Sequence, residues 1–272
     1  MIPVKNLRPF EGHPYKVLDN DEMNSLIESI QEQGILTPLV VRPIENTDEY
    51  EVISGHRRLH AAEKAGITEV PALIYALDRD AAAIAVVDSN LHREHILPSE
   101  KAFAFKLKLD ALNHQGIACG QVGHKSRDDI SDTESGRQIQ RYIRLTYLVP
   151  GLLEYMDDGK MALSVGVELS YLNTDLQYAV LDAMAQEDCT PSYAQAVRMK
   201  NMYREEMLTE DEIYSIMCQE KANQKEKVSF KADMLRRFFP KNYTTQDIEK
   251  AILLIVEADY RRRQRNRDDG AR

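Results

Sequence analysis

The sequence predicts an α+β protein, with a small mixed-sheet α/β domain at the N-terminus followed by all-α regions. Up to about residue 80, strand-like apolar runs alternate with stretches whose apolar residues recur at helical spacing. Beyond that point helical spacing prevails, and we find no internal repeat or long low-complexity block. At 272 residues, 43% hydrophobic and 29% charged, the chain fits one large or two to three small globular domains.

The N-terminal domain is predicted to alternate helices with the strands of its sheet. Asn20 and Asp21 are residue types that cap helices, and Gly34 is typical of a helix end. Thr47 and its neighbours form a polar turn between two apolar runs. The expected elements are a helix ending at Gly34, strands at 35–42 and 50–53, a helix at 56–65 and a strand at 70–75.

The rest of the chain is predicted to be helical, with Pro98, Ser99 and Glu100 opening a long helix. The expected helices are 80–90, one from 98 to about 112, 136–148, 152–156, 163–172, 175–184, one starting at Pro191, 233–239 and 245–260. Polar loops or linkers are expected at 116–132 and 221–227, and a frayed basic tail at 261–267. The expected domains are 1–97 for nucleotide binding, 98–205 for DNA binding and 206–272 as a helical C-terminal segment.

Composition limits the classes of function. The net charge of −9 means that any contact with nucleic acid comes from a local basic patch. Cys119, Cys189 and Cys218 are widely spaced, which argues against a disulfide framework or a zinc ribbon and fits a reducing cytosol. We see no signal peptide and no run of about 18 apolar residues, so a cytoplasmic protein without a membrane span is expected.

The segment at 54–62, SGHRRLHAA, follows a strand-like run and opens a helix-like run that closes at Gly66. Arg57 and Arg58 therefore lie in the first turn of a helix, where the positive end of the helix dipole disfavours cations. A glycine turn, free backbone N–H groups and two guanidinium groups form an anion site, and arginine forks match phosphate oxygens. The alternative is that both arginines are ordinary solvated charges.

A second segment, SNLHRE at 89–94, follows the helix predicted at 80–90. Its Asn90 and Arg93 are suited to the same phosphates, because an amide oxygen can complete magnesium coordination or accept a hydrogen bond. Spacing alone leaves open whether this segment meets the arginine turn. The alternative is a capping asparagine at a helix end and a surface arginine.

The helix predicted at 136–148 is amphipathic, with Ile139, Tyr142 and Ile143 on its apolar side. Arginine and glutamine gather on or beside the opposite side: Arg137, Gln138, Gln140, Arg141 and Arg144. Such a face suits the DNA major groove, since arginine reads guanine edges and glutamine reads adenine. A preceding helix and turn would complete a helix-turn-helix. The alternative is a solvated face of an ordinary amphipathic helix.

Three weaker features stay open. His56 and His60 have metal-ligand spacing, as do His92 and His95, but the neighbouring arginines repel Zn²⁺. The basic run at 261–267 suits either phosphate contact or a solubilising tail. The apolar side of the preceding helix, at 252–256, suits dimerisation.

The sequence resembles the ParB-type chromosome and plasmid partition proteins. The resemblance rests on LIESI, GILTPLVVRP and YEVISGHRR in the first part of the chain and on SNLHRE and PSEKA further along. It covers roughly residues 1–115, continues more weakly to about 200, and is positional beyond that.

The resemblance implies a CTP site with Mg²⁺ in the N-terminal domain. Carried onto this sequence, the nucleotide-binding residues are Thr37, Gly55, His56, Arg57, Arg58, Asn90 and Arg93, with Asn90 beside the metal. The resemblance also implies a palindromic centromere-like DNA site read by the helix at 136–148, and a homodimer that CTP closes into a sliding clamp. The expected partners are double-stranded DNA and a ParA-like ATPase, and the expected location is the nucleoid or a plasmid.

Three departures from the family pattern bear on catalysis. His56 stands where the family usually has glutamate, Ser89 stands where a carboxylate is expected near magnesium, and Thr37 replaces a glutamine. Because a carboxylate both binds magnesium and orients water, these changes leave CTP binding in place and make CTP hydrolysis doubtful. The segment at 126–135, expected to hold the first helix of the helix-turn-helix, is short and acidic.

Other functions for a protein of this fold stay open. A transcriptional or copy-number regulator of a plasmid or integrative conjugative element would use the same two sites. A ParB-like nuclease would need clustered carboxylates for metal, and the arginine turn offers none nearby in sequence. A sulfiredoxin-like enzyme would need a cysteine at the phosphate site, and the three cysteines lie elsewhere.

Overall fold

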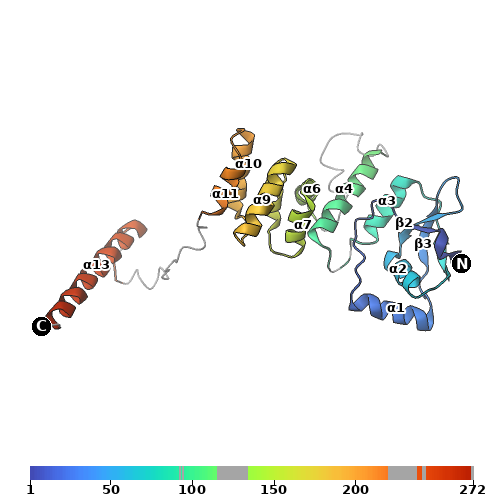
Figure 1. The fold of residues 1–272 in the computed structure, drawn as a ribbon, viewed down its shortest axis with the longest axis horizontal. Coiled ribbons are helices and arrows are strands. Elements are labelled where there is room, and N and C mark those ends of the chain that lie inside the picture. Colours follow the sequence, from blue (N-terminus) through green and yellow to red (C-terminus); the bar gives the residue numbers. More distant parts are fainter. Residues whose placement is uncertain (92, 94, 115–133, 220–237, 241–242, 271–272) are drawn as a thin grey trace. The chain divides into compact units, whose positions relative to one another are not determined.

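The computed structural model describes residues 1–91, 93, 95–114, 134–219, 238–240 and 243–270 (Figure 1). Contacts divide the chain into two units, Met1–Gln219 and Glu220–Arg272, which are described separately. The loops predicted at 116–132 and 221–227 and most of the helix predicted at 233–239 lie outside the described residues. So does most of the expected first helix of a helix-turn-helix, at 126–135.

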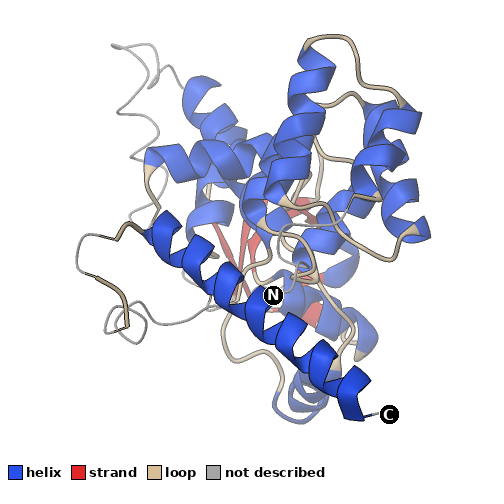
Figure 2. Ribbon diagram, turned by 90° about the vertical axis from the view of Figure 1, so that its left-hand side faces the viewer, coloured by secondary structure: helices blue, strands red, loops and turns tan. Residues whose placement is uncertain are grey.

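The first unit begins with short strands, red in Figure 2, that form a mixed sheet, as predicted. The strands are β1 (Ile2–Pro3), β2 (Leu7–Pro9), β3 (Leu39–Pro43), β4 (Tyr50–Ser54), β5 (Glu69–Val70) and β6 (Ala72–Ile74). Four of them form a sheet in the order β2-β4-β3-β6, with β3 and β4 antiparallel and the two outer pairs parallel. β1 and β5 pair separately and antiparallel.

Two helices cover part of this sheet domain and frame the turn at Gly55. They are α1 (Asp21–Gln33) and α2 (His56–Lys64), and they pack together through a small core that contains Met23, Ile30 and Ala61. The Asn20 side chain accepts a hydrogen bond from the Met23 N–H at the start of α1, as its type predicted. The sheet buries Leu39, Val41 and Val52 completely.

The sheet differs from the prediction at its edges. β3 begins at Leu39 rather than at residue 35, and the strand expected at 70–75 is divided at Pro71, which has no N–H to donate to a continuous ladder. The strands β1 and β2 and the 3₁₀ turn η1 (Val4–Asn6) were not predicted. They are two or three residues long, too short to show an alternating pattern.

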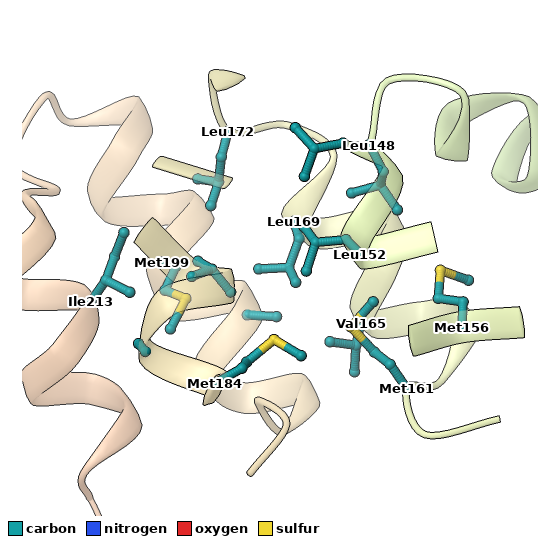
Figure 3. Packing of buried hydrophobic residues seen from close by; sticks show 14 of the residues in the cluster. Leu148, Leu152, Met156, Met161, Val165, Leu169, Leu172, Met184, Met199 and Ile213 are labelled. Carbon is teal, nitrogen blue, oxygen red and sulfur yellow. The ribbon is translucent and has the colours of Figure 1, made fainter. Parts of the chain in front are cut away.

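The first of the helices that follow packs against the sheet domain, and the rest build a second core. They are α3 (Arg79–Asp88), α4 (Pro98–His114), α6 (Gly136–Leu145), α7 (Pro150–Asp157), α8 (Leu163–Leu169), α9 (Thr174–Gln186), α10 (Tyr193–Arg204) and α11 (Glu210–Met217). Fully buried Leu152, Leu169 and Met199 lie at the centre of this core, where side chains of successive helices point toward one another (Figure 3). α6 ends at Leu145, three residues before its predicted end, and α11 was not predicted.

A segment between β2 and α1 joins the sheet domain to these helices. The Lys16 ammonium pairs with the carboxylate of Asp157 on α7 at 2.8 Å, and the Lys16 N–H donates to Glu100 on α4 at 2.8 Å. The same Asp157 carboxylate accepts both the N–H and the hydroxyl of Ser99. Residues 10–16, which we call the strap, therefore contact both parts of the first unit.

The second unit is described mainly as one helix, α13 (Thr245–Gly270). This helix continues through the basic run at 261–267, so the expectation of a frayed tail there was wrong. Leu253, Leu254, Ile255 and Val256 are each about 60% exposed on it, at 63%, 67%, 61% and 59%. None of the helices in the described ranges is long and apolar enough to cross a membrane.

Candidate functional site

The turn from β4 into α2 opens onto a cavity of about 550 Å³. Three segments far apart in the sequence line it: Glu22, Ser25 and Leu26 from α1, Ser54, Gly55, His56, Arg57 and Arg58 from the turn, and Ser89, Asn90 and Arg93 after α3. The structure therefore brings together the two segments that the sequence predicted to share one anion, which spacing alone left open. We call this cavity the arginine pocket.

Gly55 sets the geometry at the mouth of α2. Its backbone has φ 105° and ψ 22°, in the left-handed region that favours glycine. A Cβ here would lie 3.0 Å from Leu39 Cγ and 3.1 Å from Arg58 Nη2, so a side chain would crowd both. Because no side chain caps α2 and its first turn has no acidic residue, the N-terminal N–H groups are suited to an anion.

The two arginines of the turn have different contacts. Arg58 donates from Nη1 to the backbone carbonyl of Thr37 and, at 2.9 Å, to that of Pro38, and burial lowers its pKa. Arg57 pairs with the exposed carboxylate of Glu22 at 3.1 Å. Arg58 thus holds the segment before β3 against α2, whereas Arg57 remains able to exchange a carboxylate for a phosphate.

The third wall of the arginine pocket comes from the end of α3. Asn90 is 6% exposed, and its amide donates to the Val86 carbonyl at 2.8 Å and to the Ser89 hydroxyl at 3.1 Å. Those bonds use the amide nitrogen and leave the amide oxygen as the atom for a ligand. Arg93 is exposed, and its guanidinium lies 5.5 Å from the centre of the Tyr15 ring on the strap.

His56 is buried against the strap. Its Nε2 accepts a weak hydrogen bond from the Phe10 N–H at 3.4 Å, and its ring centre lies 3.6 Å from that of His13. Burial lowers the pKa of His56 to about 3, with the nearby His13 and Arg93 charges acting in the same direction. Burial also lowers the pKa of His13. His56 is therefore a neutral ring that joins the arginine pocket to the strap.

Some site residues were missed by sequence reasoning, and one predicted residue lies outside the cavity. Glu22, Ser25 and Leu26 line the arginine pocket, and their i, i+3, i+4 spacing on a helix was the available signal. Thr37 is exposed and does not line the cavity, but its carbonyl binds Arg58. The described histidines do not form a metal site with other residues of the described ranges, and His92 lies outside those ranges.

The basic face of α6 lies along α8. A groove of about 530 Å³ is lined by Ser135, Arg137, Gln138, Arg141, Ser164, Val167, Glu168 and Tyr193. Arg141 donates to the Gln138 side chain at 3.2 Å, one turn back on the same helix. On the opposite face, the buried Ile139 packs against Phe105 of α4. Three of the five predicted DNA-reading residues therefore line one groove: Arg137, Gln138 and Arg141.

The other two predicted residues are placed differently. Arg144 donates from Nε to the Ser170 hydroxyl at 3.0 Å and from Nη2 to the Ser170 carbonyl at 2.7 Å. Its guanidinium also lies over the rings of Tyr147 and Tyr171. Gln140 is half-buried and does not line the groove. The contacts of Arg144 join the end of α6 to the end of α8.

Comparison with known proteins identifies the family. The family model "ParB N-terminal domain" matches residues 1–91. The chromosome-partitioning protein Spo0J of Thermus thermophilus is 31% identical over 198 residues, which cover 72% of this chain and 69% of that protein. The chain belongs to the ParB family. The resemblance stated from the motifs is thereby confirmed.

Other ParB relatives match over a shorter share of their length. The probable chromosome 1-partitioning protein ParB of Deinococcus radiodurans is 37% identical over 165 residues, covering 60% of this chain and 52% of that protein. The chain thus spans about half the length of that relative. Among solved structures, ParB from Caulobacter crescentus complexed to the centromeric parS site is 20% identical with a TM-score of 0.43, over 79% of this chain and 97% of that one.

Proposed function

We propose that this ParB family member partitions a chromosome or plasmid by binding a palindromic DNA site through α6 and CTP in the arginine pocket. The observation that carries the proposal is the pocket itself, which gathers Gly55, Arg57, Arg58, Asn90 and Arg93 around one cavity of about 550 Å³. Cavities of about 300–1,000 Å³ hold ligands the size of a nucleotide. In this proposal CTP acts as the switch that closes a dimer into a clamp on DNA.

The chemistry of the arginine pocket fits a triphosphate. The N-terminal N–H groups of α2 and the Arg57 guanidinium supply hydrogen-bond donors and positive charge for phosphate oxygens. Arg93 is exposed at the opposite wall and can meet the same phosphates. Leu26 on α1 offers apolar surface to the remainder of the ligand. The choice of CTP among nucleotides rests on membership of the ParB family.

Magnesium fits this site as a companion of the nucleotide. The pocket offers the Asn90 amide oxygen and the Glu22 carboxylate, and Mg²⁺ commonly takes one or two protein oxygens together with phosphate oxygens and waters. When bound, the ion would neutralise phosphate charge. Ser89 has no carboxylate to orient water, and Glu22 pairs with Arg57, so we propose nucleotide binding with little hydrolysis.

The face of α6 that lines the groove fits a duplex. Arg137 and Gln138 lie in the first turn of α6, which is the end that recognition helices present to base edges, and Arg141 follows about one turn later. Their guanidinium and amide groups match the acceptors and donors of guanine and adenine in the major groove. The overall charge of −9 makes this local patch the basis of contact with DNA.

The strap connects the arginine pocket to the helical part of the first unit. Arg93 lines the arginine pocket and also lies over Tyr15, so a phosphate that binds Arg93 competes with this ring contact. Lys16, which follows Tyr15 in the strap, is held by Asp157 and Glu100 of the helical part. Nucleotide binding is therefore proposed to alter how the helical part is held, which a clamp switch requires.

The remaining partners are also proposals. The exposed apolar residues of α13, Leu253, Leu254, Ile255 and Val256, suit a second copy of this chain, so we propose a homodimer. Binding to DNA would place the protein on the nucleoid or on a plasmid in the cytoplasm. A ParA-like ATPase partner follows from family membership alone. Mass photometry should detect dimers, and monomers alone at micromolar concentrations would contradict the homodimer.

The proposed function is tested by calorimetry with all four ribonucleoside triphosphates and Mg²⁺. We expect selective binding of CTP, stronger when a DNA fragment that the protein selects from genomic DNA is present. Binding of no nucleotide with or without that fragment would contradict the nucleotide part of the proposal.

The DNA part is tested separately with the same selected fragment. Arg141→Ala should weaken specific binding by about 1–3 kcal/mol. Arg198→Ala on α10 is the matched control, because this arginine lies outside the groove and donates to Gln219 at 2.9 Å. Equal binding by the two variants would exclude α6 as the recognition helix.

A further inference from the structure

Cations and tyrosine rings alternate beside the C-terminal end of α6. The Arg144 guanidinium lies 4.6 Å from the centre of the Tyr147 ring and 4.1 Å from that of Tyr171. The Lys106 ammonium on α4 lies 5.5 Å from the Tyr147 ring, and that of Lys200 on α10 lies 5.2 Å from the Tyr171 ring. These five residues, which we call the cation–tyrosine stack, come from four parts of the fold.

The cation–tyrosine stack is open to a ligand and carries positive charge. Tyr147 is 58% exposed and Tyr171 is 46% exposed. Glu168 pairs with Lys200, and among the described residues no carboxylate forms an ion pair with Lys106 or Arg144. A positive patch on a chain of net charge −9 favours a polyanion.

The position of the cation–tyrosine stack along α6 indicates which part of a polyanion the stack contacts. With a rise of about 1.5 Å per residue, Arg144 lies about 10 Å along the helix from Arg137. The major groove is about 12 Å wide. If Arg137 and Arg141 reach base edges in the major groove, the C-terminal end of α6 lies near the edge of the major groove, where the DNA phosphates are. Backbone contacts are expected there, because they fix the register of a recognition helix.

We propose that the cation–tyrosine stack is a contact surface for the phosphate backbone of duplex DNA. The Lys106 ammonium and the Tyr147 hydroxyl meet the phosphates, and Arg144 is a positioning residue that holds the stack and α6 through Ser170. Two cations already lie over each ring, so the hydroxyls rather than the ring faces are left for the ligand, which favours a duplex over stacked single-stranded bases. This inference rests on the proposed binding of DNA.

The test measures the affinity of the full chain for a random-sequence duplex and for oligo(dT) of equal length, from about 50 to 200 mM salt. Lys106→Gln should weaken duplex binding about three- to tenfold and reduce the salt slope by about 1, because one phosphate contact is lost. Tyr147→Phe should weaken binding about two- to threefold without changing the slope, since it removes a neutral donor. Lys106→Arg should keep the wild-type slope.

Matched controls come from elsewhere in the first unit. The Lys160 ammonium also lies over a tyrosine, 5.7 Å from the centre of Tyr155, but it is not part of the cation–tyrosine stack and pairs with Asp158. Tyr178 of α9 is 49% exposed and is likewise not part of the stack. Lys160→Gln and Tyr178→Phe should therefore bind the duplex as the wild type does. A wild-type slope for Lys106→Gln, or a loss confined to oligo(dT), would overturn the inference alone. Failure of the wild-type chain to bind any duplex would overturn it together with the proposed DNA binding.

Discussion

In the arginine pocket and on the basic face of α6, the arginines have two different roles. In the pocket, Arg58 donates to two backbone carbonyls, whereas Arg57 pairs with the exposed carboxylate of Glu22. On α6, Arg144 donates twice to Ser170, whereas Arg141 contacts a glutamine of its own helix. In each region one arginine joins two elements of the fold, and another remains able to bind a ligand.

The two regions differ in the reason why one arginine is structural and the other is available to a ligand. Arg57 and Arg58 are adjacent, so about 100° of helical rotation separates their side chains and sends them to different surroundings. Arg141 and Arg144 are three apart and share one face of the helix. Their different roles come from the element opposite, because Ser170 and Tyr171 follow α8 and meet the end of α6. In the first region helical position separates the two side chains, and the segment before β3 then holds Arg58. In the second region tertiary packing alone separates the roles.

The largest effect is expected at Arg144. Arg144→Ala removes two hydrogen bonds from a charged donor and the contacts with two rings, so the free energy of unfolding should fall by about 2–4 kcal/mol. Arg141→Ala should lower it by less than about 1 kcal/mol, because its partner is a side chain on the same helix. Urea denaturation followed by circular dichroism measures both. Equal losses would show that the two arginines do not differ in structural role.

The next effect on the free energy of unfolding is expected at His56, the neutral ring that lines the arginine pocket. Unfolded His56 takes up a proton near pH 6.5, whereas folded His56 does so at about 3. Below pH 6.5 the unfolded state binds more protons, so the free energy of unfolding should fall as pH falls, by up to about 1.4 kcal/mol per pH unit. We expect this residue to account for a loss of about 2 kcal/mol between pH 7 and pH 5.

His56→Gln is the comparison variant for that pH dependence. Urea denaturation at several pH values should give a shallower decline below pH 6.5 for the variant, and parallel curves above it. Parallel curves over the whole range would show that His56 is not held neutral, and the strap would then lose its proposed link to the pocket.

A comparable effect is expected at the turn that orients the two arginines of the pocket. Gly55→Ala should lower the free energy of unfolding by about 1–3 kcal/mol, because alanine is strained at this backbone conformation. The new methyl group would also crowd Leu39 and Arg58. Gly12→Ala is the matched control, since Gly12 has φ 78° and no heavy atom within 4 Å of the position that a methyl group would take. Thermal unfolding should show a larger decrease for Gly55→Ala than for Gly12→Ala.

Much of the fold could be predicted because its signals are local. Capping residues and glycine placed α1 and α2, and apolar spacing placed α6. The short strands β1 and β2 could not be predicted, because two or three residues do not establish a period and their pairing depends on partners distant in the sequence. The same limit explains why a single strand was expected across Pro71.

The residue types of the candidate site could be predicted from the sequence, but the separate roles of its arginines could not. The glycine and paired arginines identified the turn, and the structure shows that Asn90 and Arg93 share its cavity. Whether Arg58 meets a ligand or the carbonyls of Thr37 and Pro38 depends on a segment 20 residues away, which no local pattern describes. Glu22 was missed for the same reason, because it reaches the cavity from α1, which lies apart from the turn in the sequence.

The most direct test of this account is a calorimetric titration of CTP and Mg²⁺ into Arg57→Ala. The matched control is Arg8→Ala, an exposed arginine of β2 that pairs with Glu49 outside the pocket. We predict that Arg57→Ala binds CTP at least about tenfold more weakly than wild type, the loss of one charge-assisted contact. Its unfolding midpoint should stay within about 2 °C of that of the control, because its partner is exposed. Binding of CTP by Arg57→Ala with wild-type affinity would contradict the claim that this arginine is the one left for the ligand.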